Sequence, residues 1–212
     1  MSLSTRRFLP RPAMTGYSDR LNHAFAYAAK HHDRLVRKGA RAPYLTQPAN
    51  VAVILTRYGR DEDTVVAGIL HDVIEDCVQE GWTAEMLDDR LGAKFGAASV
   101  ALAVAVVRRR TDDEGIELSR EESRADQLRR IAVAPDAARW VAAADAVHET
   151  GALLADLRRT IDRDAVWGRV PGGREAALAF SAELLTALGS GGWSGAIGEE
   201  LQGLRDQVSE IR

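Results

Sequence analysis

Apolar residues recur at helical spacing along almost all of the chain after residue 15. Val65, Val66, Ile69 and Leu70 show the pattern, because positions three and four residues apart share one side of a helix. Strand-like alternation is not convincing anywhere. The periodic segments predict helices over residues 17–34, about 49–58, 61–76, 83–91, 97–109, 120–131, 136–159, 173–188 and 196–211. The sequence therefore predicts an all-α fold, arranged as a single helical bundle.

The first 15 residues break this pattern. They contain Arg6, Arg7, Pro10, Arg11 and Pro12 without apolar periodicity, which favours a loosely ordered N-terminal arm over residues 1–15. The remaining residues, 16–212, are predicted to form one helical domain. A chain of 212 residues with 46% hydrophobic residues can bury one good-sized core, and no internal repeat or long heptad seam argues for another architecture.

Charge and cysteine content narrow the classes of partner. A net charge of -3 gives no nucleic-acid signature, and no apolar run approaches the roughly 20 residues that a membrane span requires. The single cysteine, Cys77, excludes an internal disulfide and fits a reducing compartment. The N-terminus lacks the apolar core of a signal peptide. We therefore expect a cytoplasmic protein with no nucleic-acid or membrane partner, whose oligomeric state the sequence leaves open.

The segment from His71 to Asp76 concentrates one imidazole and three carboxylates in six residues. Helical spacing brings His71 over Glu75 and Asp72 over Asp76, so all four side chains can share one face. Ionised carboxylates on a partly buried helix face need a cation or hydrogen bonds to compensate for their lost hydration. A divalent metal site is the simplest explanation; the alternative is a solvated acidic helix end.

A further carboxylate stands in the apolar helical run from residue 140 to 148. Asp145 is the candidate distant metal ligand, although it could instead form a salt bridge within the bundle. His148 follows nearly one turn later, and we favour a core or supporting role for it over a ligand role. His31 and His32, near the end of the first predicted helix, are weaker candidates for metal ligands.

Together these motifs resemble the HD-domain hydrolases of the RelA/SpoT type, including the small stand-alone alarmone hydrolases. The resemblance rests on residues 37–39 (Arg-Lys-Gly), residues 43–48 (Pro-Tyr-Leu-Thr-Gln-Pro), the His-Asp and Glu-Asp pairs of residues 71–76, and Ala-Asp at residues 144–145. It covers roughly residues 20 to 160. It implies that His71, Asp72 and Asp145 help to bind one Mn²⁺ ion, or another divalent metal. It also implies that Glu75 and Asp76 activate the attacking water.

The chain departs from the family pattern at specific positions. Gln47 stands where the family has its first metal-binding histidine, and a neutral carboxamide oxygen is a weaker ligand that suits only a hard cation such as Mn²⁺ or Mg²⁺. After Asp145, Ala146 and Glu149 stand where the family usually has arginine and asparagine. These differences affect both the metal site and the residues that would hold a nucleotide.

A metal-dependent phosphohydrolase follows from the acidic cluster together with nearby basic residues. Arg37 and Lys38 are suited to pairing with substrate phosphates that the acids alone would repel. By resemblance, the substrate is a guanosine tetra- or pentaphosphate that loses its 3′-pyrophosphate, or a similar phosphorylated nucleotide such as NADPH. The alternative is a catalytically degenerate HD domain that binds a nucleotide or a partner, which Gln47 favours and the intact Glu75-Asp76 pair disfavours.

Overall fold

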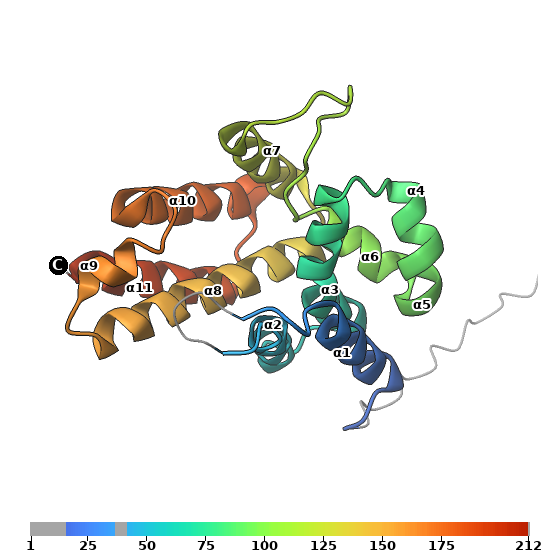
Figure 1. Ribbon diagram of the computed structural model, residues 1–212, viewed down its shortest axis with the longest axis horizontal. Helices are drawn as coiled ribbons and strands as arrows, with labels where there is room; N and C mark the ends of the chain where they lie inside the picture. The colour runs from blue at the N-terminus through green and yellow to red at the C-terminus, as the bar shows by residue number, and fades with distance from the viewer. Residues whose placement is uncertain (1–15, 37–41, 212) are drawn as a thin grey trace, which may run out of the picture.

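Helix α3 (Glu62–Gln79) is the central helix of the N-terminal half of the molecule (Figure 1). The computed structural model describes residues 16–36 and 42–211. Four helices pack on α3, namely α1 (Asp19–His31), α2 (Thr46–Arg57), α6 (Ala97–Val104) and α8 (Asp136–Arg159). Val66, Ile69, Leu70 and Ile74 of α3 are fully buried in the core. This packing confirms the apolar side of α3 that the sequence predicts.

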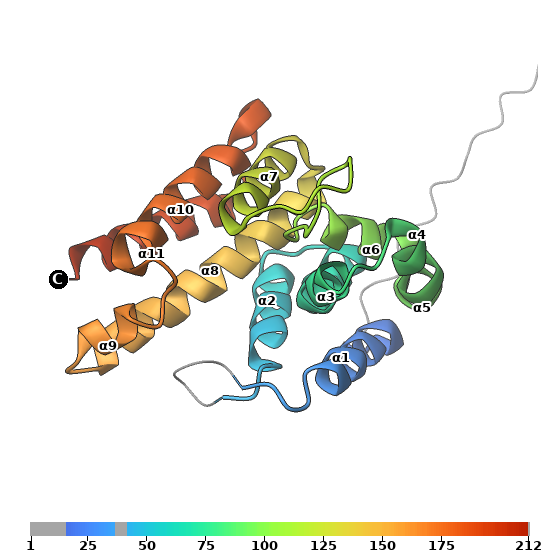
Figure 2. The same cartoon turned by 45° about the horizontal axis from the view of Figure 1, so that its top comes forward.

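The long helix α8 separates two groups of helices (Figures 1 and 2). On one side lie α1, α2 and α3, and on the other lie α7 (Arg120–Val133), α10 (Gly173–Leu188) and α11 (Ala196–Glu210). The described part also contains three short helices, α4 (Ala84–Leu87), α5 (Ala93–Phe95) and α9 (Arg163–Trp167), a π-helical turn at Asp88–Gly92 and a 3-10 turn at Ser190–Gly192. The all-α prediction is confirmed. Among the described residues, no helix is both long and apolar enough to span a membrane.

A glycine lets α2 and α3 approach each other closely. A Cβ atom built on Gly68 would lie 2.5 Å from Cδ1 of Leu55 and 3.1 Å from Cγ1 of Val51, so a larger residue would force these side chains of α2 to shift. This close contact matters for the site, because α2 also carries Gln47 and the carbonyl of Gly68 accepts a hydrogen bond from His71.

Most predicted helices have the expected positions, but several ends differ. The predicted helix over 97–109 was too long, since α6 ends at Val104. The reason is a distant arginine: Arg130 donates to the carbonyls of Val104 and Ala105 and so satisfies the helix end. The segment 83–91 divides into α4 and the π-helical turn, and the prediction missed α5 and α9. The first helix was also predicted three residues too far, because α1 ends at His31.

Candidate functional site

His71 and Asp72 of α3 meet Asp145 of α8 and form a three-residue cluster. Nε2 of His71 lies 3.2 Å from Oδ1 of Asp72 and 3.3 Å from Oδ1 of Asp145. Nδ1 of His71 lies 2.7 Å from the carbonyl oxygen of Gly68, which can only accept, so Nδ1 carries a proton. The structure therefore brings together the three residues that the sequence proposes as metal ligands, with Nε2 facing both carboxylates.

Two polar atoms of this cluster are buried without a hydrogen-bond partner. They are Nε2 of His71, whose two close carboxylate contacts lack hydrogen-bond geometry, and Oδ2 of Asp72. Buried polar atoms are nearly always paired, so unpaired ones suggest a missing ligand. An imidazole nitrogen beside two carboxylates is also a donor set that divalent metals use. The described residues thus fit a bound cation.

The electrostatics of the cluster also favour a cation. Burial, together with the carboxylates of Asp145 and Glu75, raises the pKa of Asp72 to about 6. Burial opposes a charge on His71, but the charges of Asp72 and Asp145 outweigh it and raise the pKa of the imidazole well above its usual value. The field that draws a proton to this nitrogen would draw a divalent cation as well.

Gln47, at the start of α2, contacts the cluster through its amide. Its Nε2 donates a hydrogen bond to Oδ1 of Asp145 over 3.1 Å, and the residue is buried. With this orientation the side chain supports Asp145 and does not present its oxygen to the carboxylates. His71, Asp72 and Asp145 therefore remain the three candidate ligand side chains, and Gln47 is a supporting amide.

The acidic pair that follows on α3 separates toward two different neighbours. Glu75 accepts a hydrogen bond from Nε of Arg108 at 2.9 Å, another from Nη2 of Arg108, and one from the Arg108 backbone N–H at 3.0 Å. The Arg108 side chain, which follows α6, is 48% exposed and so remains accessible to a ligand. Spacing in the sequence did not predict Arg108 as a site residue. Its side chain can contact Glu75 on α3 because α6 ends at Val104, before Arg108.

Asp76 lies against the end of α1. Its Oδ2 is 3.2 Å from Nε2 of His31 and 3.2 Å from Nε2 of His32. These contacts, with that of His32 foremost and burial opposing, lower the pKa of Asp76. Helical spacing alone predicts that His71, Asp72, Glu75 and Asp76 share one face, but their partners lie in three different places.

Tyr44 lies beside His32 and close to the carboxylates of the cluster. Its ring packs on that of His32 with centroids 4.6 Å apart. Burial, followed by the charges of Asp72 and Asp145, raises the pKa of the phenol, which therefore stays protonated and able to donate a hydrogen bond. The predicted phosphate-binding residues Arg37 and Lys38, and the predicted arm of residues 1–15, lie outside the described residues.

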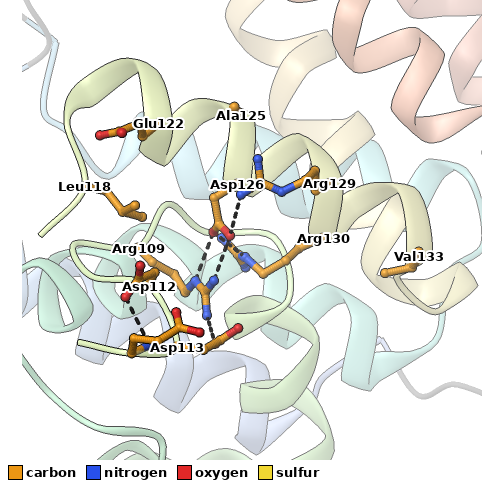
Figure 3. A pocket seen from close by; sticks show the side chains of 11 residues that line it. Arg109, Asp112, Asp113, Leu118, Glu122, Ala125, Asp126, Arg129, Arg130 and Val133 are labelled. Atoms are coloured by element: carbon orange, nitrogen blue, oxygen red, sulfur yellow. Dashed lines mark hydrogen bonds and ion pairs between the residues drawn. The ribbon is translucent and has the colours of Figure 1, made fainter. Parts of the chain in front are cut away.

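A cavity lies beside α7, and its lining contains none of the residues of this cluster (Figure 3). It measures about 670 Å³, and Arg109, Asp126 and Arg130 of its lining are already paired with one another. Asp126 accepts hydrogen bonds from Nη2 of Arg109 at 2.7 Å and from Nε of Arg130 at 2.9 Å. Because these arginines are held by a carboxylate, the cavity is a poor candidate for an anion-binding site.

The sequence model of the HD domain family matches residues 24–165, which includes the whole cluster. The chain belongs to the HD domain family. This match confirms the resemblance to HD-domain proteins that the sequence predicts. The dipeptide His71-Asp72 is part of the motif on which that prediction rests.

Curated relatives of this HD domain are much longer proteins. The chain is 33% identical over 116 residues to a GTP pyrophosphokinase of Myxococcus xanthus. The matched region is 55% of this chain and 14% of that protein. It is 32% identical over 78 residues to a guanosine-3′,5′-bis(diphosphate) 3′-pyrophosphohydrolase of Aquifex aeolicus, over 37% of this chain and 11% of that protein. The matches thus span about a seventh or less of these relatives.

A solved structure shares the fold over nearly the entire HD domain chain. It comes from work on a metazoan ortholog of SpoT that hydrolyses ppGpp, and it superimposes with a TM-score of 0.69 and 22% sequence identity. The superposition covers 94% of this chain and 100% of the other. At this identity the likeness establishes the common fold.

Proposed function

We propose that this HD domain is a metal-dependent phosphohydrolase that removes a 3′-pyrophosphate or phosphate group from a nucleotide. The observation that carries the proposal is the buried, unpaired Nε2 of His71 between the carboxylates of Asp72 and Asp145. The substrate class is supported by the relative from Aquifex aeolicus, whose name specifies a 3′-pyrophosphohydrolase of guanosine bis(diphosphate). Guanosine tetraphosphate and NADPH are the two candidate substrates whose hydrolysis we propose to compare.

His71, Asp72 and Asp145 would hold the metal, and we propose Mn²⁺ because the set combines carboxylate oxygens with one imidazole. When bound to these residues, such a cation would supply Lewis-acid polarisation of a phosphoryl oxygen and would lower the pKa of a water molecule. Gln47 keeps Asp145 in place through its hydrogen bond. Cation binding also removes the cost of keeping two carboxylates close together in a partly buried site.

Glu75 and Asp76 would orient the water and accept its proton as the water oxygen bonds to phosphorus. The bond between phosphorus and the ribose 3′-oxygen then breaks, the 3′-oxygen takes a proton from solvent to become a hydroxyl, and pyrophosphate is released. Glu75 is tied to Arg108, whose exposed guanidinium can exchange this carboxylate for a substrate phosphate. That exchange would free Glu75 at the moment when substrate binds. Arg37 and Lys38 are proposed as further partners of the substrate phosphates.

A binding module without turnover is the second candidate. It is favoured by Gln47, which donates to Asp145 where a strong fourth ligand is expected, and by the existing partners of Glu75 and Asp76. In that case the domain would bind a phosphorylated nucleotide or a partner and release it unchanged.

The deciding experiment measures pyrophosphate or phosphate release from guanosine tetraphosphate and from NADPH, with Mn²⁺ and with chelator. Asp145→Asn should lose the activity. The matched control is Asp156→Asn, which changes an acid on the same helix three turns further along and should keep it. Metal-dependent release that fails only in Asp145→Asn supports the hydrolase. No release, together with no Mn²⁺ binding, favours the binding module.

A further inference from the structure

A second group of metal-binding side chains lies beside the first cluster, where α1 ends against α3. One ligand atom each of His31, His32 and Asp76 lies within 4.8 Å of the other two, and Nε2 of both histidines lies 3.2 Å from Oδ2 of Asp76. Neighbouring residues on a helix normally point about 100° apart. Here both rings reach the same oxygen because α1 ends at His31, and His32 adopts φ −103° and ψ 21° outside the helix. The end of α1 at His31 thus brings the two rings together at Asp76.

The distances match those of a zinc site. Zinc binds imidazole nitrogen and carboxylate oxygen at about 2.0–2.2 Å in tetrahedral geometry, which places two ligand atoms about 3.4 Å apart. Both nitrogens lie 3.2 Å from Oδ2 of Asp76. The distance between the two nitrogens can adjust through the His31 ring, because that side chain is partly exposed. We propose that His31, His32 and Asp76 form a second cation site, which takes zinc.

The choice of zinc follows from the ligand types. Two imidazoles and one carboxylate suit zinc better than Mn²⁺ or Mg²⁺, which prefer oxygen ligands. Three protein ligands also leave a fourth position for water, as in open zinc sites. The first cluster has the opposite balance, with two carboxylates and one imidazole. The two sites would therefore differ in metal preference.

The site is partly built before any ion arrives. The side chain of His32 is 1% exposed and packs between the rings of Tyr44 and His31, with centroid distances of 4.6 and 4.8 Å. Its Nδ1 is buried without a hydrogen-bond partner, so the contact with Asp76 is what orients this ring. His31 and Asp76 are 26% and 48% exposed, which leaves an open path for an ion from solvent.

This site would oppose the proposed hydrolysis, and that consequence rests on the proposed function. Zinc on Oδ2 would occupy the carboxylate that is proposed to accept a proton, so zinc should inhibit turnover while Mn²⁺ supports it. Zinc binding itself does not depend on any activity. The test therefore measures binding alone, and it can fail or succeed whether or not the chain is a hydrolase.

The experiment counts zinc bound per chain by equilibrium dialysis of the chelator-stripped protein, starting from Asp145→Asn to weaken the first cluster. Asp145→Asn should retain one zinc. Adding His31→Ala should weaken that zinc by more than about 100-fold, because loss of a ligand exceeds the usual effect of outer-shell changes. The matched control adds His23→Ala, an exposed histidine two turns earlier on α1, and should retain the zinc.

Two results would overturn the proposal: no zinc on Asp145→Asn, or zinc that survives His31→Ala. Circular dichroism checks that each variant is folded. Should Asp145→Asn not fold, the His31→Ala and His23→Ala changes are compared in the wild-type chain. A loss of one zinc in His31→Ala alone then supports the site, and equal zinc content overturns it. Asp76→Asn, which keeps the side-chain shape, provides an independent second variant.

Discussion

Gln47 donates a hydrogen bond to Asp145 across 98 positions of the sequence, from Nε2 to Oδ1 at 3.1 Å. Gln47 therefore contacts the proposed metal site through the carboxylate of Asp145. A histidine would add a lone pair to the cluster, whereas the amide orientation seen here adds an N–H. The number of strong ligands at this site is thus set by one position on α2.

Replacing Gln47 by histidine should strengthen metal binding. Restoring an imidazole supplies a fourth strong ligand, and changes to supporting residues alone alter metal affinity about 10- to 100-fold, so we expect a gain of at least about tenfold for Mn²⁺. Isothermal titration calorimetry on both proteins measures the gain. Gln47→Leu is the control, because it removes the donor to Asp145 without adding a ligand and should weaken binding. Equal affinity in Gln47→His and wild type would argue against a metal beside Asp145.

Metal affinity should rise with pH. The pKa of Asp72 is raised to about 6 and that of His71 lies well above its usual value, so in acid both groups hold protons that a cation must displace. Raising the pH removes these protons before binding and strengthens it. We expect at least about tenfold tighter Mn²⁺ binding at pH 8 than at pH 5, since each displaced proton contributes up to tenfold per pH unit. Titrations in a series of buffers would show a flat profile if neither group is a ligand.

The double variant Glu75→Gln with Asp76→Asn should abolish hydrolysis while leaving the fold intact. The amides keep the shapes of the acids but cannot accept the water proton. Glu75 loses a charged contact with the partly exposed Arg108, which costs about 1 kcal/mol of unfolding free energy. Turnover and thermal unfolding are measured on the same preparation. Retained turnover would show that the proton goes to another group.

Much of the fold is predictable from the sequence because helix periodicity and helix capping residues determine where several helices begin and end. Residues 136–159 and 173–188 form helices with the predicted bounds, and Asp61 caps α3 by accepting from the backbone N–H of Thr64 at 2.9 Å. The cluster of His71, Asp72 and Asp145 was also predictable, since the acids stand within apolar helical runs and the motif has a specific spacing.

The end of α6 and the partners of Glu75 and Asp76 could not be predicted, because they depend on contacts between distant segments. The end of α6 is set by Arg130, which lies about 25 residues away and reaches its terminal carbonyls. The early end of α6 in turn places Arg108 on Glu75. His31 and His32 point at Asp76 only because α1 stops where it does. Periodicity carries no information about these encounters, because each requires knowledge of how helices pack.

Asp126 should contribute strongly to stability, and its contribution should depend on pH. The side chain is 6% exposed and is held by Arg109 and Arg130 (Figure 3). Asp126→Asn removes the carboxylate that both guanidinium groups share and leaves Arg109 only its exposed contact with Asp113, so we expect a loss of about 2 kcal/mol of unfolding free energy at pH 7. The control is Asp113→Asn, whose carboxylate also contacts Arg109 but is 83% exposed, and which should cost under about 1 kcal/mol.

The pH dependence follows from the direction of the Asp126 shift. Burial alone would raise its pKa, but the hydrogen bonds from Arg109 and Arg130 outweigh burial and lower the pKa below the usual value. A lowered folded-state pKa stabilises the fold above the unfolded-state pKa of about 3.9, and this contribution is lost as the pH falls through the folded-state value. The stability difference between wild type and Asp126→Asn, measured by urea unfolding, should therefore shrink below about pH 4. A difference that stays constant down to pH 2 would mean that the arginines do not act on the ionised carboxylate.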